Sequence, residues 1–206
     1  MTPAERAAFY SEAFPKYPAL RSDDRWIDGM WVIGNSYGGT GYYGAYPGNY
    51  LKRVMSLFPD KESVLHLFSG SLPPGDYIRF DVDLTLDAEV HGYAKDLHKK
   101  VGRNRFDLVI VDPPYSKEHA ARYGSKMINR KTVVSECAKV LAPGGHLVWL
   151  DTMLPMFRKD ELYWCGAIGV CVSTNHLIRG CFIFKKANQG ADAGTAEGHG
   201  KGGEDV

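Results

Sequence analysis

Apolar residues along the chain occur in two kinds of pattern, short continuous runs and runs with helical spacing. Phe106–Val111 and residues 63–68 are almost continuously apolar, as buried parallel strands are. In residues 50–58 the apolar positions recur every three or four residues, which predicts a helix that ends before Pro59. Strand and helix patterns that follow one another in this way predict an α/β fold.

The same periodicities predict the remaining elements. Further strands are expected at residues 76–82, 146–150, 165–172 and 177–184. Further helices are expected at residues 3–14, 93–101, 128–141 and 154–163. Thr2 is the expected N-cap of the first helix, because Pro3 fits the first helical turn.

Composition divides the chain into three parts. Residues 44–186 carry the regular pattern and predict one α/β domain, and residues 1–43 are expected to form an N-terminal extension that packs on this core. Residues 187–206 contain mainly small and charged residues, which predicts a disordered tail. Residues 36–48 are rich in Gly and Tyr, which is compatible with a surface loop or with a lid over a binding site.

Overall composition narrows the class of protein. A chain of 206 residues with 44% hydrophobic and 24% charged residues is typical of one soluble domain. A net charge of +1 means that any nucleic-acid surface must be a local patch. No apolar run reaches the ~20 residues of a membrane span, and Glu5, Arg6 and Glu12 interrupt any signal peptide.

The cysteines and histidines carry no metal-site spacing. The four cysteines lack Cys-x-x-Cys pairs, and no histidine is placed to complete a zinc set. We therefore expect free thiols, no bound metal and a cytoplasmic location.

The motif Asp112-Pro113-Pro114-Tyr115 directly follows the apolar run Phe106–Val111. Open α/β sheets bind their ligands at the carboxyl ends of their strands. The two prolines fix φ and remove two N–H donors, so the neighbouring carbonyls are held stiffly. The motif thus offers a carboxylate, a carbonyl and an aromatic ring to a planar ligand with an exocyclic amino group. The alternative is a proline-rich capping turn.

This motif resembles the catalytic motif of the class I S-adenosylmethionine-dependent amino-methyltransferases, in particular the Dam-like N6-adenine DNA methyltransferases. Residues 44–53 and 64–71 resemble the segments of that family that hold the cofactor, and residues 140–149 resemble its Pro-Gly-Gly and strand signature. The resemblance implies a Rossmann-like fold. Its expected form is a mostly parallel seven-stranded sheet with helices on both faces and a C-terminal antiparallel hairpin.

The resemblance also implies a cofactor site. The residues that it assigns to S-adenosylmethionine are Tyr46, Pro47, Gly48, Phe68, Ser69, Gly70, Asp81, Tyr93 and Asp112. Asp81 is preferred over Asp83 for the ribose hydroxyls, while Tyr93 is expected either to stack on the adenine or to belong to the core. His66 stands where the family usually has an acid, and Leu72 where it has a third glycine.

Under the same resemblance, the catalytic residues are Asp112, Pro113, Pro114 and Tyr115. Asp112 and the carbonyl of Pro113 would accept the two N–H groups of the target amine, and Tyr115 would stack on the base. The products would be the methylated base and S-adenosylhomocysteine. No metal would be needed, because the leaving sulfur becomes a neutral thioether.

A basic segment that directly follows the motif is the expected contact to nucleic-acid phosphates. Its charged residues are Lys117, Arg122, Lys126, Arg130 and Lys131. A solvated helix face is the alternative interpretation. The chain has no room for a separate target-recognition domain. Either specificity is poor, or it comes from a homodimer partner, another subunit, the N-terminal region or structured RNA.

The sequence therefore predicts methyl transfer from S-adenosylmethionine to N6 of adenine in DNA. Two alternatives stay open. One is methylation of an RNA base, and the other is a catalytically inactive methyltransferase-fold subunit that binds nucleic acid or a partner.

Overall fold

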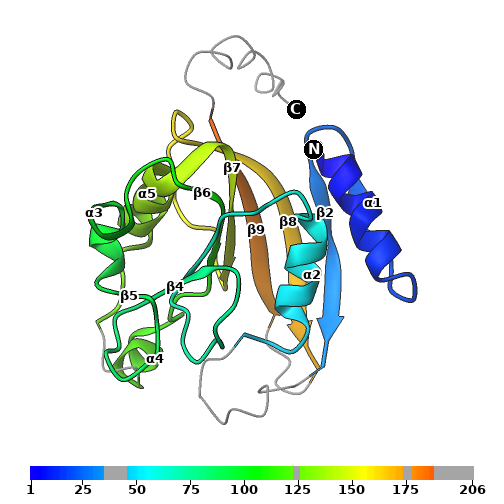
Figure 1. Cartoon of the computed structure of the whole chain (residues 1–206). Helices are drawn as coiled ribbons and strands as arrows, with labels where there is room; N and C mark the ends of the chain where they lie inside the picture. Colours follow the sequence, from blue (N-terminus) through cyan, green and yellow to red (C-terminus); the bar gives the residue numbers. More distant parts are fainter. Residues whose placement is uncertain (35–45, 123–125, 174–177, 188–206) are drawn as a thin grey trace, which may run out of the picture.

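The computed structural model describes residues 1–34, 46–122, 126–173 and 178–187, with the side chain of Arg122 excluded. Within these residues one nine-stranded sheet has the order β1-β2-β8-β9-β7-β6-β3-β4-β5 (Figure 1). The strands are β1 (Arg21–Ser22), β2 (Ile27–Ile33), β3 (Val64–Leu67), β4 (Ile78–Asp81), β5 (Val90–His91), β6 (Phe106–Val111), β7 (Leu141–Asp151), β8 (Leu162–Val172) and β9 (Ile178–Lys186).

Most of the sheet is parallel. Strands β2 to β8 run in the same direction, whereas β1 pairs antiparallel with β2, and β9 pairs antiparallel with both β7 and β8. The expectation of seven strands is wrong, because residues 1–43 contribute β1 and β2 to the sheet itself. Side chains alternate between the two faces of β2, because Ile27, Trp31 and Ile33 are buried while Met30 and Val32 are exposed.

The helices are α1 (Pro3–Ala13), α2 (Tyr50–Leu57), α3 (Leu97–Val101), α4 (Lys117–Arg122) and α5 (Arg130–Val140), and a short 3₁₀ helix, η1 (Ala94–Asp96), precedes α3. Thr2 caps α1 as predicted, in a capping box with Glu5. The helix predicted at residues 154–163 is wrong. Pro155 disfavours helical backbone at Leu154, and Leu154 and Met156 are exposed, so their spacing does not mark a buried stripe.

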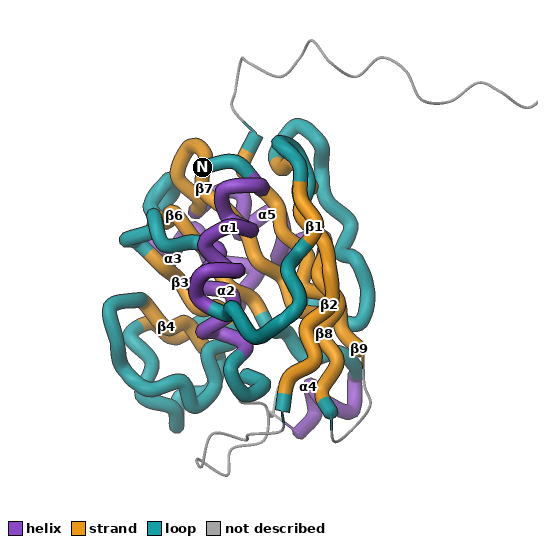
Figure 2. Tube along the Cα trace, turned by 90° about the vertical axis from the view of Figure 1, so that its right-hand side faces the viewer, coloured by secondary structure: helices purple, strands orange, loops and turns teal. Residues whose placement is uncertain are grey.

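Helices cover both faces of the sheet (Figure 2). On β6, Leu108 and Ile110 pack in the same core cluster as residues of α1 and α2. The alternate residues Val109 and Val111 pack in a second cluster with residues of α3 and α5. The near-continuous apolar run of β6 therefore reflects burial on both sides.

The carboxyl ends of β3, β4, β6 and β7 lie at one edge of the sheet, together with the first residues of the antiparallel strand β9. β3 pairs with β4 on one side and with β6 on the other, so the strand order reverses direction there. Open α/β sheets bind ligands at such a switch point.

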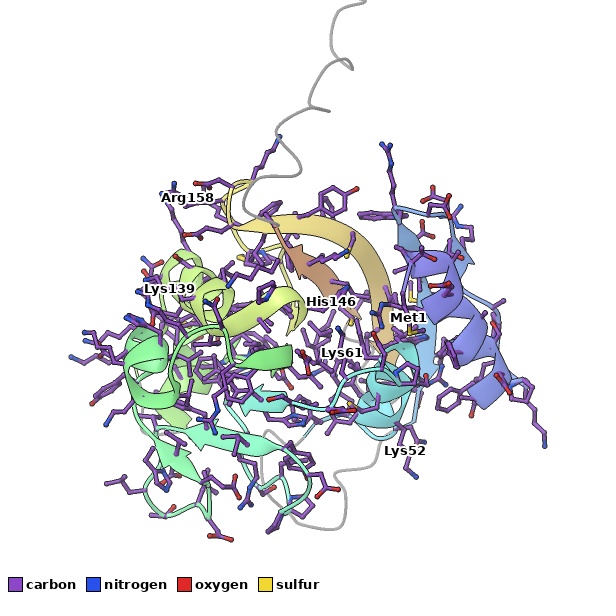
Figure 3. The ribbon with its side chains drawn as sticks, turned by 45° about the horizontal axis from the view of Figure 1, so that its top comes forward. Met1, Lys52, Lys61, Lys139, His146 and Arg158 are labelled. Carbon is purple, nitrogen blue, oxygen red and sulfur yellow. The ribbon has the colours of Figure 1, made fainter. Side chains whose placement is uncertain are left out.

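The opposite edge of the sheet carries a different set of contacts. Figure 3 brings this edge forward, with His146 and Lys61 near its centre. Here the buried Arg6 of α1 donates from Nη1 to the carbonyl of Leu57, at the end of α2, and to Asp60 Oδ1, both at 2.8 Å. These bonds join the N-terminal helix to the core.

None of the helices in the described ranges has the length and apolar character needed to cross a bilayer. The four cysteines are free thiols, and Cys137, Cys165 and Cys181 are buried.

Candidate active site

The turn after β3 has an unusual backbone. Phe68 has φ 62° and Gly70 has φ 53°, both in the left-handed region. The amides of Phe68 and Ser69 donate to the carbonyl of Phe80 at 2.9 and 3.2 Å, which holds the turn against β4. A positive φ at a bulky residue such as Phe68 is strained, and such strain concentrates at functional sites.

Asp81 ends β4 and supports this turn. Its Oδ2 accepts the amide of Gly70 at 2.9 Å, and its Oδ1 accepts the amide of Asp83 at 3.1 Å. A carboxylate oxygen can accept more than one bond, so Asp81 retains capacity for a hydroxyl ligand. Asp83 Oδ1 instead accepts hydrogen bonds from the amide and the hydroxyl of Thr85, at 2.9 and 2.7 Å. The geometry thus favours Asp81 over Asp83.

Two buried polar atoms near Asp81 have no hydrogen-bond partner among the described residues. They are Ser69 Oγ, in the turn, and Nδ1 of His91, which pairs with Asp81 across the sheet. Buried polar atoms are nearly always satisfied. Unpaired atoms beside a glycine turn and a carboxylate therefore fit the adenosine part of a nucleoside cofactor.

Tyr46 lies between the ends of β4 and β6. Its hydroxyl is 3.3 Å from Nδ1 of His66, and its ring stacks on Tyr50 with centroids 5.8 Å apart. Burial raises the pKa of Tyr46 well above 10, and the nearby charges of Asp112 and Asp81 raise this pKa further. Tyr46 is therefore a neutral hydroxyl that reaches both strand ends.

The segment that leads into α2 supports this position. The Pro47 carbonyl accepts the amide of Tyr50 at 3.0 Å, and Gly48 is buried. Burial lowers the pKa of His66 to about 4, so its imidazole is neutral at pH 7. The amino-methyltransferases that the sequence resembles usually have an acid at this position. His66 instead offers an uncharged hydrogen-bond donor or acceptor.

Asp112 follows β6 directly and is half-buried, and Pro113 and Pro114 behind it are buried. The Tyr115 hydroxyl donates to Asp112 Oδ1. Burial raises the pKa of Asp112 to about 6, although the charge of Arg179 and the Tyr115 bond oppose this rise. At pH 7 most molecules therefore present Asp112 as an ionised acceptor.

Arg130, the first residue of α5, is tied into the interior. Its Nε donates to Asp151 Oδ2 at 2.6 Å, and its Nη2 donates to the Tyr115 carbonyl at 3.2 Å. Asp151 is fully buried and also accepts the indole N–H of Trp149 at 3.1 Å. Arg130 was expected to contact phosphate, but here it anchors the segment that carries Tyr115.

Two buried charged residues beside the motif escaped the sequence analysis. Arg179 was a single charge inside the apolar run 177–184, and Asp151 was an acid directly after the apolar run 146–150. Both patterns could have indicated buried ion pairs or hydrogen bonds, because a charged side chain within or at the end of a buried strand needs a partner. Their partners are distant in sequence, so the pattern alone did not assign them a role.

The other expected site residues lie further out. Lys117, Lys126 and Lys131 are exposed, and the Arg122 side chain lies outside the described residues. Tyr93 follows β5 with its ring 65% exposed, and Lys95 Nζ is 5.5 Å from the ring centroid. Most of the Gly- and Tyr-rich segment and nearly all of the predicted tail also lie outside the described residues.

A cavity of about 420 Å³ lies beside this site, between α2, β3 and the segment before β4. Its lining residues are Leu51, Met55, Lys61, Glu62, Val64, His66, Asp76 and Tyr77. Neither Gly70 nor Asp112 lines it, and His66 joins it to Tyr46. The cavity is therefore a neighbour of the strand-end site and not the site itself.

No known protein-family model matches the chain, and no curated protein is significantly similar to it. Several solved structures are similar in part. The crystal structure of TrmN from Thermus thermophilus has a TM-score of 0.44 at 14% identity, covering 61% of this chain and 44% of that one. The CurJ carbon methyltransferase has a TM-score of 0.42 at 11% identity, covering 66% and 53%.

An arsenic(III) S-adenosylmethionine methyltransferase from Chlamydomonas reinhardtii has a TM-score of 0.33 at 16% identity, covering 60% of this chain and 62% of that one. The chain thus spans less than two thirds of each of these three structures. Likenesses of this size do not define the class of protein. The α/β, Rossmann-like fold rests on the strand order and on the helices that cover both faces.

Proposed function

We propose that this protein transfers a methyl group from S-adenosylmethionine to an exocyclic amino group of a nucleic-acid base, most favourably N6 of adenine in DNA. The observation that carries the proposal is the Asp112 carboxylate. It is half-buried, adjoins Tyr115 at the end of β6, and lies one strand from the strained glycine turn of β3. The same edge thus holds a candidate cofactor turn and a candidate acceptor for an amine.

In this proposal the residues of the chain act by positioning and by charge. When bound, the cofactor supplies an electrophilic methyl group on a sulfonium. The Ser69 and Gly70 turn and the Asp81 carboxylate hold its adenosine part. Because the Tyr115 hydroxyl occupies Asp112 Oδ1, Oδ2 is the oxygen that accepts one N–H of the amine, and the Pro113 carbonyl accepts the other. Fixed acceptors orient the nitrogen lone pair toward the methyl group, and Asp112 would take up the N–H proton that the amine loses when it gains the methyl group.

The first test is cofactor binding by calorimetry, comparing the wild type with Gly70→Leu. A leucine at Gly70 would be strained at φ 53° and would project from the turn that holds the cofactor. Gly144→Leu is the matched control, because Gly144 has φ 72° with open space around it and lies in the amino-terminal part of β7. We expect micromolar binding that only Gly70→Leu loses. Equal binding by both variants would contradict the cofactor assignment.

The second test is transfer of a labelled methyl group to matched oligonucleotides. DNA with adenine is compared with the same DNA carrying purine, which lacks the 6-amino group, and with RNA of the same sequence. Label in adenine DNA but not in purine DNA supports N6 transfer. Label only in RNA would replace the DNA target by an RNA base, and cofactor binding without any transfer would leave a binding subunit.

A further inference from the structure

Arg179 lies near the start of β9, in an otherwise apolar strand. Because β9 is antiparallel to β7, with Asp151 opposite Gly180, this start lies where β6 and β7 end. The side chain of Arg179 is only 8% exposed. A guanidinium is costly to bury, so its contacts indicate why it is there.

Two consecutive hydrogen bonds connect Arg179 to Asp112 by way of Tyr115. Arg179 Nη1 is 2.8 Å from the Tyr115 hydroxyl oxygen, and its guanidinium carbon is 5.6 Å from the Tyr115 ring centroid. Arginine can only donate, so the hydroxyl oxygen accepts this bond. The single hydroxyl proton of Tyr115 is then directed to Asp112 Oδ1.

A comparison with Arg6 separates this role from a structural one. Arg6 is also buried, but it forms a direct ion pair with Asp60 at 2.8 Å. In the described part of the chain Arg179 has no carboxylate within ion-pair distance, and Tyr115 stands between it and Asp112. The positive charge of Arg179 therefore lowers the pKa of Asp112 directly, while its hydrogen bond fixes the Tyr115 hydroxyl that donates to the carboxylate.

Arg179 is the counter-charge of Asp112, as the charges of the surrounding groups indicate. Asp151 of β7 is negative, Tyr115, Tyr46 and Tyr50 are neutral at pH 7, and Arg179 of β9 is positive. The titratable ring of His119, in α4, lies edge-on to the Tyr115 ring with centroids 5.9 Å apart. Arg130, the other nearby cation, is paired with Asp151. Removing Arg179 would leave Asp112 in a buried site without an effective counter-charge.

We propose that Arg179 is a positioning residue that fixes the Tyr115 hydroxyl on Asp112 Oδ1 and thereby presents the ionised Oδ2 to the amine of the substrate. The inference rests on the proposed function, because it deepens the role of the same carboxylate. Arg179 itself touches neither substrate nor cofactor in this scheme.

The test compares Arg179→Met, Arg179→Lys and Tyr115→Phe in two measurements. The first is the pH profile of methyl transfer, whose acid limb reflects Asp112. Loss of a neighbouring cation raises a carboxyl pKa by about one unit or more. In Arg179→Met we expect the acid limb to move up by that amount, so that transfer falls about five-fold at pH 6 and is largely recovered at pH 9.

The second measurement needs no turnover. Carbon NMR of protein labelled at aspartate carboxyl groups follows the titration of Asp112, assigned by its loss in Asp112→Asn. The Asp112 midpoint should rise in Arg179→Met and return toward the wild-type value in Arg179→Lys. In a Tyr115→Phe background the effect of Arg179→Met on transfer should shrink, because the part of the effect that runs through the Tyr115 hydroxyl is already lost.

Arg6→Met is the control, since it removes a buried arginine that lies at the other edge of the sheet. It should lower stability without moving the acid limb or the Asp112 midpoint. An unchanged midpoint in Arg179→Met would overturn the inference. If that variant does not fold, a Tyr115→Phe midpoint that equals the wild type would overturn it, because this variant removes the hydroxyl that Arg179 holds on Asp112. If the wild type transfers no methyl group, the proposed function fails while the titration still decides the role of Arg179.

Discussion

Two aspartates at opposite edges of the sheet show how the same side chain is used for stability and for chemistry. At one edge, burial disfavours ionisation of Asp60, but two hydrogen bonds from Arg6, at 2.8 and 3.2 Å, outweigh burial and lower its pKa to about 2. At the other edge, burial raises the pKa of Asp112 to about 6, although the charge of Arg179 opposes this rise, and Arg179 donates its hydrogen bond to Tyr115 and not to the carboxylate.

The difference lies in how completely each carboxylate is satisfied. Asp60 has a direct cationic partner and joins the N-terminal helix to the core. Within the described residues, Asp112 accepts the Tyr115 hydroxyl on Oδ1, has no direct cationic partner, and lies one strand from a strained turn. A protein tolerates such incomplete pairing where a ligand completes it, and it does so at the expense of stability.

The largest expected effect is on catalysis by Asp112. Asp112→Ala removes the acceptor of the target amine, and we expect transfer to fall roughly a thousand-fold. Cofactor affinity, measured by calorimetry, should change less than about three-fold, because the turn at Gly70 remains. Asp60→Ala should retain transfer wherever it is folded. Near-normal turnover by Asp112→Ala would remove Asp112 from the chemistry.

The next effect is on stability at the other edge. Asp60→Ala leaves the Arg6 guanidinium, 4% exposed, without its counter-charge, and we expect a loss of about 2 to 4 kcal/mol in the free energy of unfolding. The control is Asp160→Ala, whose partner Arg158 is exposed, so its loss of stability should be far smaller. Urea unfolding measures both, and equal losses would contradict the comparison.

Lowering the pH should change the contributions of Asp112 and Asp60 to folding stability in opposite directions. The folded-state pKa of Asp112, about 6, lies above its ordinary value of 3.8, so ionisation of Asp112 destabilises the fold. This destabilisation is fully present above the folded-state pKa. Protonation relieves this as the pH falls from 7 to 4. The Asp60 pKa is lowered to about 2, so its stabilisation holds above pH 4 and is lost as the pH falls through 2.

Asp112→Asn isolates the first of these effects. A shift of this size corresponds to about 1 to 3 kcal/mol, so Asp112→Asn should be more stable than the wild type by about that amount at pH 8 and by less at pH 5. Urea unfolding of both proteins at the two pH values measures the difference. A stability gain that does not change with pH would show that Asp112 is not the titrating group.

The smallest effect concerns the exposed lysines after the motif. Lys117→Gln and Lys126→Gln should each weaken binding of a DNA duplex by a few-fold and reduce the slope of log affinity against log salt by about one. Lys159→Gln is the control, because it neighbours Arg158 at the opposite edge, labelled in Figure 3. Equal effects at all three positions would indicate nonspecific charge and not a phosphate-binding patch.

The core strands were predictable from local pattern. Phe106–Val111 forms β6 over the residues expected, because a short, almost continuously apolar run that is followed closely by two prolines has few other stable solutions. The helix at Tyr50–Leu57 was also predictable from its apolar spacing. The error at residues 154–163 arose where apolar residues at helical spacing are exposed, and one of them precedes a proline.

By itself, the sequence determined the α/β pattern, the position of Asp112-Pro113-Pro114-Tyr115 after a strand, and the candidate glycine turn, because these depend on neighbouring residues. Only the tertiary structure decided that β2 joins the sheet beside β8, that Arg130 pairs with Asp151, and that Arg179 reaches Tyr115. Burial and ion pairing depend on which strands become neighbours. Arg179 and Tyr115 are 64 positions apart in the chain and meet only when β9 inserts next to β7.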